Sequence, residues 1–256
     1  MKFDIITLFP NMFEGPFSES IISRAKKQKL IDININQLRD YALDKHKTVD
    51  DTPCGGGPGM VLRVDIIDSA ISNVKSQRSK SKNSRTILLT PKGENFTQKK
   101  AIELSKHDNI ILICGHYEGF DQRVHDHLVD EEISIGNYVL TGGEIPAMVL
   151  IDTITRMIPG TINKESIENE SHMPQKQDTG CKIQDANKSQ IENSKKPPTT
   201  NYSLPTNYDY PVYTRPTEYK GWKVPEVLLS GNHKKIDTWR NEGGGAKQNR
   251  STPTCE

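Results

Sequence analysis

The sequence predicts an α/β fold built around a mostly parallel sheet. Within the first 160 residues, apolar runs of strand length alternate with longer stretches of helical spacing, which is the pattern of strands joined by crossover helices. Three of these runs also end at a loop that contains glycine. Parallel sheets bind ligands beyond the carboxyl ends of their strands, so these loops predict where a site lies.

The pattern begins with two strands and a helix before residue 40. Residues 3–8 form an apolar run of strand length, and residues 32–38 alternate isoleucine with polar residues, as a half-buried strand does. Between them, residues 17–30 have helical spacing with lysines on the outer face.

Three junctions between a strand and a glycine-bearing loop follow, with a helix expected at 97–106. A single junction of this kind is often an ordinary turn. Three together favour a cofactor pocket, because glycine lets a ligand approach the backbone closely. The sequence has neither G-x-G-x-x-G after a strand nor G-x-x-x-x-G-K-[ST], which counts against the common dinucleotide enzymes and NTPases. The strands and their loops are 86–90 before 91–93, 109–114 before 115–119, and 133–140 before 141–144.

Composition changes after Gly160. Residues 172–207 are mostly polar, so they cannot bury enough apolar surface to offset the entropy of ordering, and we expect a flexible insertion. Apolar patterning resumes at residue 210, and the tail from residue 241 is again polar and glycine-rich. We therefore divide the chain into a first domain (1–160), a linker (161–209) and a small C-terminal domain (210–256).

Composition excludes several classes of protein. The 256 residues carry a formal net charge of +1, so binding to a nucleic acid would depend on local patches. No apolar run reaches the roughly 18 residues of a membrane span, and the N-terminus does not resemble a signal peptide. The four cysteines form no C-x-x-C pair, which argues against a zinc ribbon or a disulfide framework. We expect a cytoplasmic protein.

Four further features are candidates for function. Residues 53–59 hold four glycines and two prolines, so they form a structural turn or a loop that offers backbone N–H groups to a base or phosphate. Arg156 ends a helix that begins near Pro146, where it either favours the helix C-terminus or serves a site. The acidic stretch 165–171 is typical of a solvated surface. The run from 75 to 100 has eight Lys or Arg and one acid, so it is a solubilising loop or a track for an RNA backbone.

Four stretches of sequence together resemble one family. They are DKHKTVDDTPCGGGPGM, ICGHYEGFDQRV, EEISIGNYVLTGGEIPAMVLID and YTRP followed by LLSGNH. In this order and spacing they resemble the bacterial tRNA (guanine-N(1))-methyltransferases. The resemblance covers most of residues 1–160 and then 210–240. It implies the knotted SPOUT class, with a deep trefoil knot at the cofactor site, a small and mainly helical C-terminal domain, and a homodimer whose sites are built by both subunits.

The resemblance also implies the reaction and the cofactor. The expected activity is methyl transfer from S-adenosylmethionine to N(1) of the guanosine at position 37 of tRNA, next to the anticodon. Carried over motif by motif, the cofactor-binding residues are Thr90, Pro91, Gly115, Tyr117, Glu118, Gly119, Ser134, Ile135, Gly136, Tyr138, Val139, Leu140, Gly142, Gly143 and Pro146. The residues expected to bind tRNA are His46, Asp50, Gly57, Pro58, Gly59, Met60, Arg215, Ser230 and His233.

The expected catalytic residues are a carboxylate base and Arg156. The family uses an aspartate to take the guanine N(1) proton and an arginine near O6. Arg156 matches the arginine, whereas the base position holds Glu170, with Glu168 as the fallback. A magnesium ion, if one assists, would lie at Glu118 or at the acids Asp130, Glu131 and Glu132.

Two alternatives to this function remain open on the sequence. One is a related knotted methyltransferase that acts on another RNA. The other is a non-catalytic RNA-binding descendant, which would explain the glutamate at the base position and the short C-terminal part.

Overall fold

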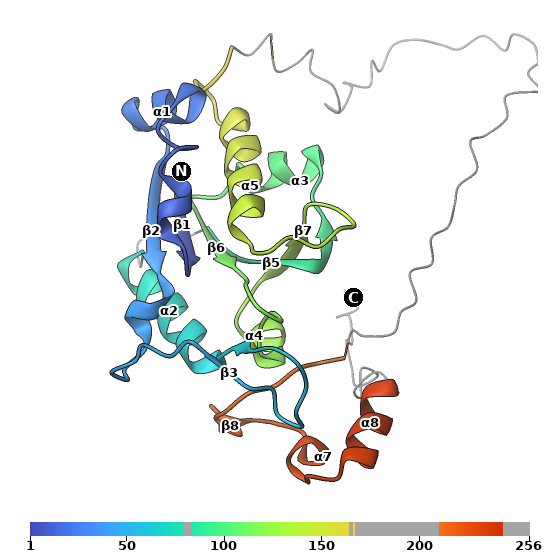
Figure 1. The fold of residues 1–256 in the computed structure, drawn as a ribbon. Coiled ribbons are helices and arrows are strands. Elements are labelled where there is room, and N and C mark those ends of the chain that lie inside the picture. Colours follow the sequence, from blue (N-terminus) through green and yellow to red (C-terminus); the bar gives the residue numbers. More distant parts are fainter. Residues whose placement is uncertain (79–82, 164–165, 167–209, 243–256) are drawn as a thin grey trace, which may run out of the picture.

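A computed structural model describes residues 1–78, 83–163, 166 and 210–242. Its centre is a five-stranded sheet in the order β2-β1-β6-β5-β7, and every neighbouring pair in it is parallel (Figure 1). The predicted parallel α/β fold is therefore confirmed. The strands are β1 (Lys2–Thr7), β2 (Asp32–Gln37), β5 (Ser84–Asn95), β6 (Asn109–Cys114) and β7 (Glu131–Ser134).

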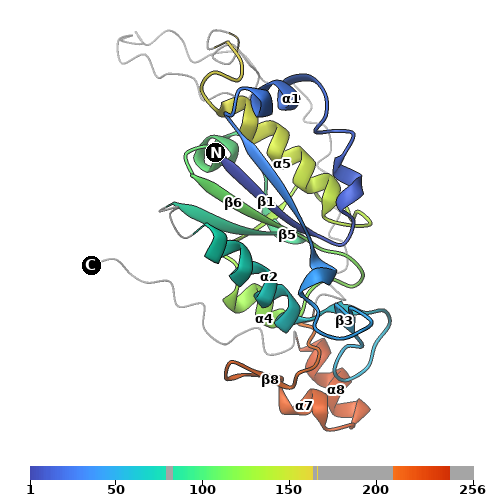
Figure 2. The same cartoon turned by 90° about the vertical axis from the view of Figure 1, so that its left-hand side faces the viewer.

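Helices cover both faces of this sheet (Figure 2). On one face, α1 (Ser20–Lys27), α3 (Gln98–Leu104) and α5 (Glu144–Met157) pack on a cluster that includes Phe3 and Ile5. On the other face, α2 (Val64–Gln77) and α4 (Gln122–His127) pack on a cluster that includes Ile6. Because side chains alternate along a strand, neighbouring residues of β1 pack into the cores on opposite faces of the sheet. The short 3₁₀ helices are η1 (Pro10–Phe13) and η2 (Leu38–Tyr41).

The expected strand at 133–140 is wrong beyond Ser134. The hydroxyl of Ser134 donates to the carbonyl of Gly136 at 2.9 Å and accepts from the Gly136 N–H at 3.2 Å. This local pair turns the chain, so the apolar residues that follow belong to a loop. Apolar patterning alone could not separate them from the strand, although Tyr138 and Val139 are exposed in the structure.

Other boundaries also differ from the prediction. The expected strand at 86–90 continues as β5 to Asn95, and its register against β7 shifts between Leu89 and Glu94. The expected helix at 17–30 is shorter, because the backbone is extended at Glu19 and Lys29 has a positive φ. Helices α2 and α4 were not assigned from the sequence, whereas β6 has the predicted bounds.

Residues 210–242 form a hairpin and two helices that pack on the first part of the chain (Figure 1). The hairpin pairs β8 (Glu218–Tyr219) with β9 (Trp222–Lys223), and the helices are α7 (Glu226–Leu229) and α8 (His233–Asn241). A small core of Val224, Leu228 and Ile236 holds them together. Among the described residues, no helix is long and apolar enough to cross a membrane.

Candidate cofactor cavity and RNA interface

A cavity of about 450 Å³ lies at the carboxyl ends of β6 and β7 and against residues 89–92 within β5. All fifteen residues expected to bind the cofactor line it, and they come from the three glycine-bearing junctions and the start of α5. A cavity of this size suits a small cofactor. The sequence did not identify the remaining lining residues, which are Leu89, Lys92, His116, Phe120, Gln122, His125, Ile133, Thr141 and Val212.

Close backbone contacts shape the floor of the cavity. The N–H of Gly143 donates to the carbonyl of Gly115 at 2.9 Å. A β-carbon on Gly143 would lie 2.6 Å from the Cα of Cys114, so no larger residue fits there without moving the backbone. Glycine at this position therefore allows two of the three junctions to touch.

A buried acid, Glu144, follows Gly143 directly and contacts the end of β1. Glu144 is the first residue of α5 and is 2% exposed. Its carboxylate accepts from the hydroxyl of Thr7 at 2.7 Å, and that hydroxyl accepts from the N–H of Phe9 at 2.9 Å. Burial, followed by the charge of Glu144, raises the pKa of the Cys114 thiol well above its ordinary value. Cys114 is therefore a neutral core residue.

The glycine-rich loop is tied to the edge of the cavity. The carbonyl of Met60 accepts from the N–H of Glu118 at 3.0 Å, and the N–H of Leu62 donates to the carbonyl of Gly119 at 3.0 Å. Leu62 also forms a parallel bridge with Phe120. Gly57, Pro58, Gly59 and Met60, which are expected to bind RNA, therefore lie in a loop that adjoins the lining residues Glu118 and Gly119.

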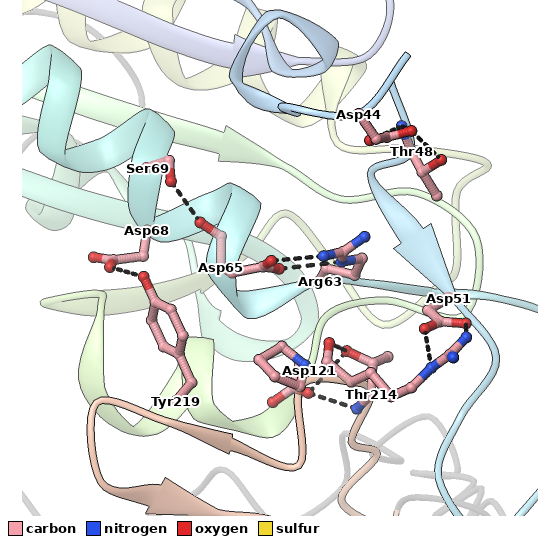
Figure 3. Close-up of polar contacts among 12 residues, drawn as sticks. Asp44, Thr48, Asp51, Arg63, Asp65, Asp68, Ser69, Asp121, Thr214 and Tyr219 are labelled. Carbon is pink, nitrogen blue, oxygen red and sulfur yellow. Dashed lines mark hydrogen bonds and ion pairs between the residues drawn. The ribbon is translucent and has the colours of Figure 1, made fainter. Parts of the chain in front are cut away.

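Two further expected RNA contacts flank this loop. Asp50 belongs to the short hairpin of β3 (Asp50–Asp51) and β4 (Val61–Leu62). His46 is exposed, and its backbone N–H donates to the carboxylate of Asp44 at 3.1 Å. Asp44 also accepts from Thr48 (Figure 3), and this hydrogen bond lowers the pKa of the Asp44 carboxyl. The turn that carries His46 is thus braced by an ionised aspartate.

Arg215 is held beside the same hairpin. Its guanidinium makes two hydrogen bonds to the Asp51 carboxylate, at 2.8 and 2.9 Å, and these lower the pKa of Asp51. The Arg215 side chain is 73% exposed, so it faces solvent while its orientation is set by Asp51. Ser230 follows α7 and His233 begins α8, and neither lines the cavity.

Of the two expected catalytic residues, the structure describes only Arg156, which lies apart from the cavity. Arg156 is in the last turn of α5, ten residues after Pro146, which places it about 15 Å along the helix axis from the cavity edge. Arg156 does not line the cavity. Glu170 and its alternative Glu168 lie outside the described residues, so the structure does not place the base.

Three of the four acids named for magnesium serve as structural partners, while Glu118 lines the cavity. Asp130 accepts from the N–H of Thr86 at 2.7 Å, Glu131 pairs with Lys100 at 3.2 Å, and Glu132 contacts His125 at 3.2 Å. Within the described part of the chain, no group of three or more His, Cys, Asp or Glu side chains could hold a metal ion.

Part of the basic run at 75–100 also has a structural role. Arg78 pairs with the buried Asp4 of β1 at 2.9 Å, and Lys100 pairs with Glu131 of β7. Arg85 also pairs with Glu131, at 3.6 Å. At least three of the eight cations therefore pair with acids of the sheet, which leaves fewer for an RNA backbone.

Known proteins of one family are similar to this chain over nearly its whole length. The family model described as tRNA (Guanine-1)-methyltransferase TrmD matches residues 1–203 and 187–253. A protein of Alkaliphilus metalliredigens named tRNA (guanine-N(1)-)-methyltransferase is 47% identical over 243 residues, which cover 94% of this chain and 86% of that protein. Proteins with the same name are 43% identical over 242 residues in Bacillus subtilis (94% and 86% covered) and 47% identical over 244 residues in Ruminiclostridium cellulolyticum (94% and 89% covered).

Proposed function

This chain belongs to the tRNA (Guanine-1)-methyltransferase TrmD family, and we propose that it transfers a methyl group from S-adenosylmethionine to N(1) of the guanosine at position 37 of tRNA. One observation carries the proposal. The fifteen residues that the motifs assign to the cofactor come from three separate stretches of sequence, and they line a single cavity. Its position beyond the carboxyl ends of parallel strands is where such sheets bind ligands.

The lining of the cavity fits S-adenosylmethionine. Apolar side chains such as Ile135 and Leu140 offer a surface for a flat adenine ring. Glu118 supplies a negative charge at the rim, where a sulfonium or ammonium group would be favoured. When bound, the cofactor supplies an electrophilic methyl group.

The remaining chemistry concerns the guanine. At neutral pH its N(1) carries a proton that blocks attack, and removal of this proton by a positioned base contributes about 10²–10⁴-fold to the rate. We assign this role to Glu170, with Glu168 as the alternative. As the proton leaves, negative charge develops on O6, and a cation there stabilises it. We assign that cation to Arg156.

Arg156 can reach this cavity if two copies of the chain share the site. Ile145, Val149 and Arg156 lie on one stripe of α5, because residues four and seven positions apart return to the same face. Ile145 and Val149 are exposed apolar residues, as are Phe9 and Met12 next to and within η1, which contacts α5. A second copy that covers this apolar surface would bring Arg156 of the partner subunit into the interface.

The rest of the proposal follows from the same family membership. We propose a cytoplasmic homodimer, with the chain knotted at the cavity. Residues 1–160 would bind the cofactor, residues 161–209 would link the two parts, and residues 210–256 would bind tRNA. The glycine-rich loop with His46 and Asp50, together with Arg215, Ser230 and His233, would contact the anticodon region.

The direct test is methyl transfer to two unmodified tRNA transcripts. One carries guanosine at positions 36 and 37, and the other carries adenosine at position 37. We expect the first alone to be methylated, at N(1). Equal transfer to both would overturn position 37. Retained cofactor binding with no transfer to either would favour an RNA-binding protein or an enzyme for another RNA.

Shared sites can be tested by mixing two inactive variants. Arg156→Ala lacks the cation, whereas Leu140→Trp fills the cavity. If each site combines one cavity with the partner subunit's Arg156, random mixing restores about one quarter of the wild-type sites. If each site is built within one chain, the mixture stays inactive. Each variant alone is the control.

A further inference from the structure

Two buried charged residues next to the cavity have no place in the proposed mechanism. Asp121 is 0% exposed and Arg123 is 2% exposed. They follow Gly119 and Phe120, which line the cavity, and their side chains pair at 2.8 Å. A buried ion pair costs desolvation energy, so stability alone is a weak reason for it.

The pair forms hydrogen bonds with residues 214–222, some 90 residues later in the sequence. The Asp121 carboxylate accepts from the N–H of Thr214 at 2.6 Å and from its hydroxyl at 3.2 Å (Figure 3). Thr214 is itself 0% exposed. Arg123 donates to the carbonyls of Thr214 at 2.9 Å, Pro216 at 2.8 Å and Trp222 at 3.4 Å.

These contacts use the whole guanidinium group. Two hydrogen bonds go to Asp121 and three go to carbonyls, one for each of the five N–H groups. Because the guanidinium is planar and rigid, all five bonds form only when residues 214–222 occupy one position. A lysine could satisfy at most three of these acceptors.

The segment held in this way also forms part of the cavity wall. Val212 lines the cavity beside Phe120 and Gln122. The N–H of Gln122 donates to the carbonyl of Val212 at 2.7 Å. The loop that carries Glu118 and Gly119 is therefore joined to the C-terminal segment through Asp121, Gln122 and Arg123.

We propose that Asp121 and Arg123 are positioning residues that couple the docking of residues 210–242 to cofactor binding. A bound cofactor favours the arrangement in which Phe120, Gln122 and Val212 meet, and that arrangement places Arg215 and α8 for RNA. By reciprocity, a docked segment raises cofactor affinity by the same factor. The inference rests on the proposed function, because it takes S-adenosylmethionine as the occupant of the cavity.

The two tryptophans of the chain allow this coupling to be measured. Trp222 and Trp239 both lie in the C-terminal segment, and the Trp222 ring stacks on His127 at 4.2 Å. Acrylamide quenching of tryptophan fluorescence in the full-length protein therefore reports on docking of this segment alone. Calorimetric titration with S-adenosylmethionine gives the cofactor affinity of the same samples.

The test compares Arg123→Lys with Arg78→Lys. Arg78 also pairs with a buried aspartate, Asp4 of β1, but it follows α2 and does not line the cavity. We expect Arg123→Lys to raise the Kd for S-adenosylmethionine about 5-fold or more, to increase quenching, and to weaken the protection from quenching that the cofactor gives the wild type. For Arg78→Lys we expect a lower Tm with unchanged affinity and quenching.

Two outcomes would overturn the coupling. One is a folded Arg123→Lys variant with wild-type affinity for the cofactor. The other is an equal loss of affinity in Arg78→Lys. If Arg123→Lys does not fold, Thr214→Val removes the hydroxyl contacts with Asp121 and with the carbonyl of Arg215 but keeps the backbone bond to Asp121. It should show a smaller change in the same direction, and wild-type affinity in it would overturn the coupling. A wild-type protein that binds no S-adenosylmethionine would overturn the proposed cofactor itself, and the coupling with it.

Discussion

Gly59 lies so close to Glu118 that a β-carbon added to Gly59 would come within 2.6 Å of the Glu118 carboxylate. This contact joins the glycine-rich loop, which we expect to hold RNA, to the rim of the cofactor cavity. It means that the two expected binding regions are neighbours in the folded chain, although some sixty residues separate them in sequence.

The contact predicts different effects for two alanine substitutions in the same loop. Gly59 and Gly56 both have a positive φ, so alanine costs roughly 1–2 kcal/mol at either position. Only Gly59→Ala also pushes against Glu118, since nothing lies within 4 Å of a β-carbon at Gly56. We expect similar losses in Tm, with a fall in kcat/KM on the order of 10-fold or more for Gly59→Ala alone. Equal kinetic losses would contradict this.

Glu170→Gln should separate catalysis from cofactor binding. If Glu170 is the base, the amide cannot accept the guanine proton, so kcat should fall about 10²–10⁴-fold with an unchanged affinity for S-adenosylmethionine. Single-turnover methylation and calorimetry measure the two quantities. Glu168→Gln is the matched control. A loss of turnover in Glu168→Gln and not in Glu170→Gln would move the base to Glu168.

Arg215→Ala should weaken RNA binding with little effect on stability. The ion pair with Asp51 is exposed on the arginine side, and exposed pairs contribute little to stability. We expect KM for tRNA to rise and the slope of log K against log salt to fall by about one. Arg24→Ala, an exposed arginine on α1 at the other end of the sheet, controls for the lost charge. An unchanged salt slope would exclude a phosphate contact.

The raised pKa of Tyr213 leads us to predict a loss of stability at high pH. Burial raises the pKa of Tyr213 from 10.0 to about 12. The folded state therefore keeps this proton after the unfolded state has lost it, so the free energy of unfolding falls as the pH rises between these two values. Because the ring is only partly buried, we expect a change on the order of 1 kcal/mol.

Urea denaturation at several pH values, with Tyr213→Phe as the reference, isolates this effect from other groups. The stability of the wild type relative to Tyr213→Phe should be constant below pH 10 and should fall above it. A difference that does not change with pH would show that the Tyr213 hydroxyl titrates alike in both states.

Patterns along the chain predicted the parallel sheet and the place of the cavity. Strand β6 was found at its full length because all six of its residues are buried and the five after Asn109 are apolar, with no competing local pattern. The three glycine-bearing junctions marked the cavity for a physical reason: backbones that pack as closely as Gly115 and Gly143 exclude a side chain. The family resemblance then assigned individual lining residues, which no periodicity could do.

Sequence patterns could not predict the contacts between segments that are distant along the chain. Asp121 and Arg123 lie within a recognised motif, yet their burial and their hydrogen bonds to Thr214 depend on how residues 210–242 fold back onto α4. Val212 becomes part of the cavity wall in the same way. Local residue types decide which strands, turns and close backbone approaches can form. Only the packed chain decides which remote donors and acceptors meet, because a buried ion pair persists only where every hydrogen-bonding group around it finds a partner.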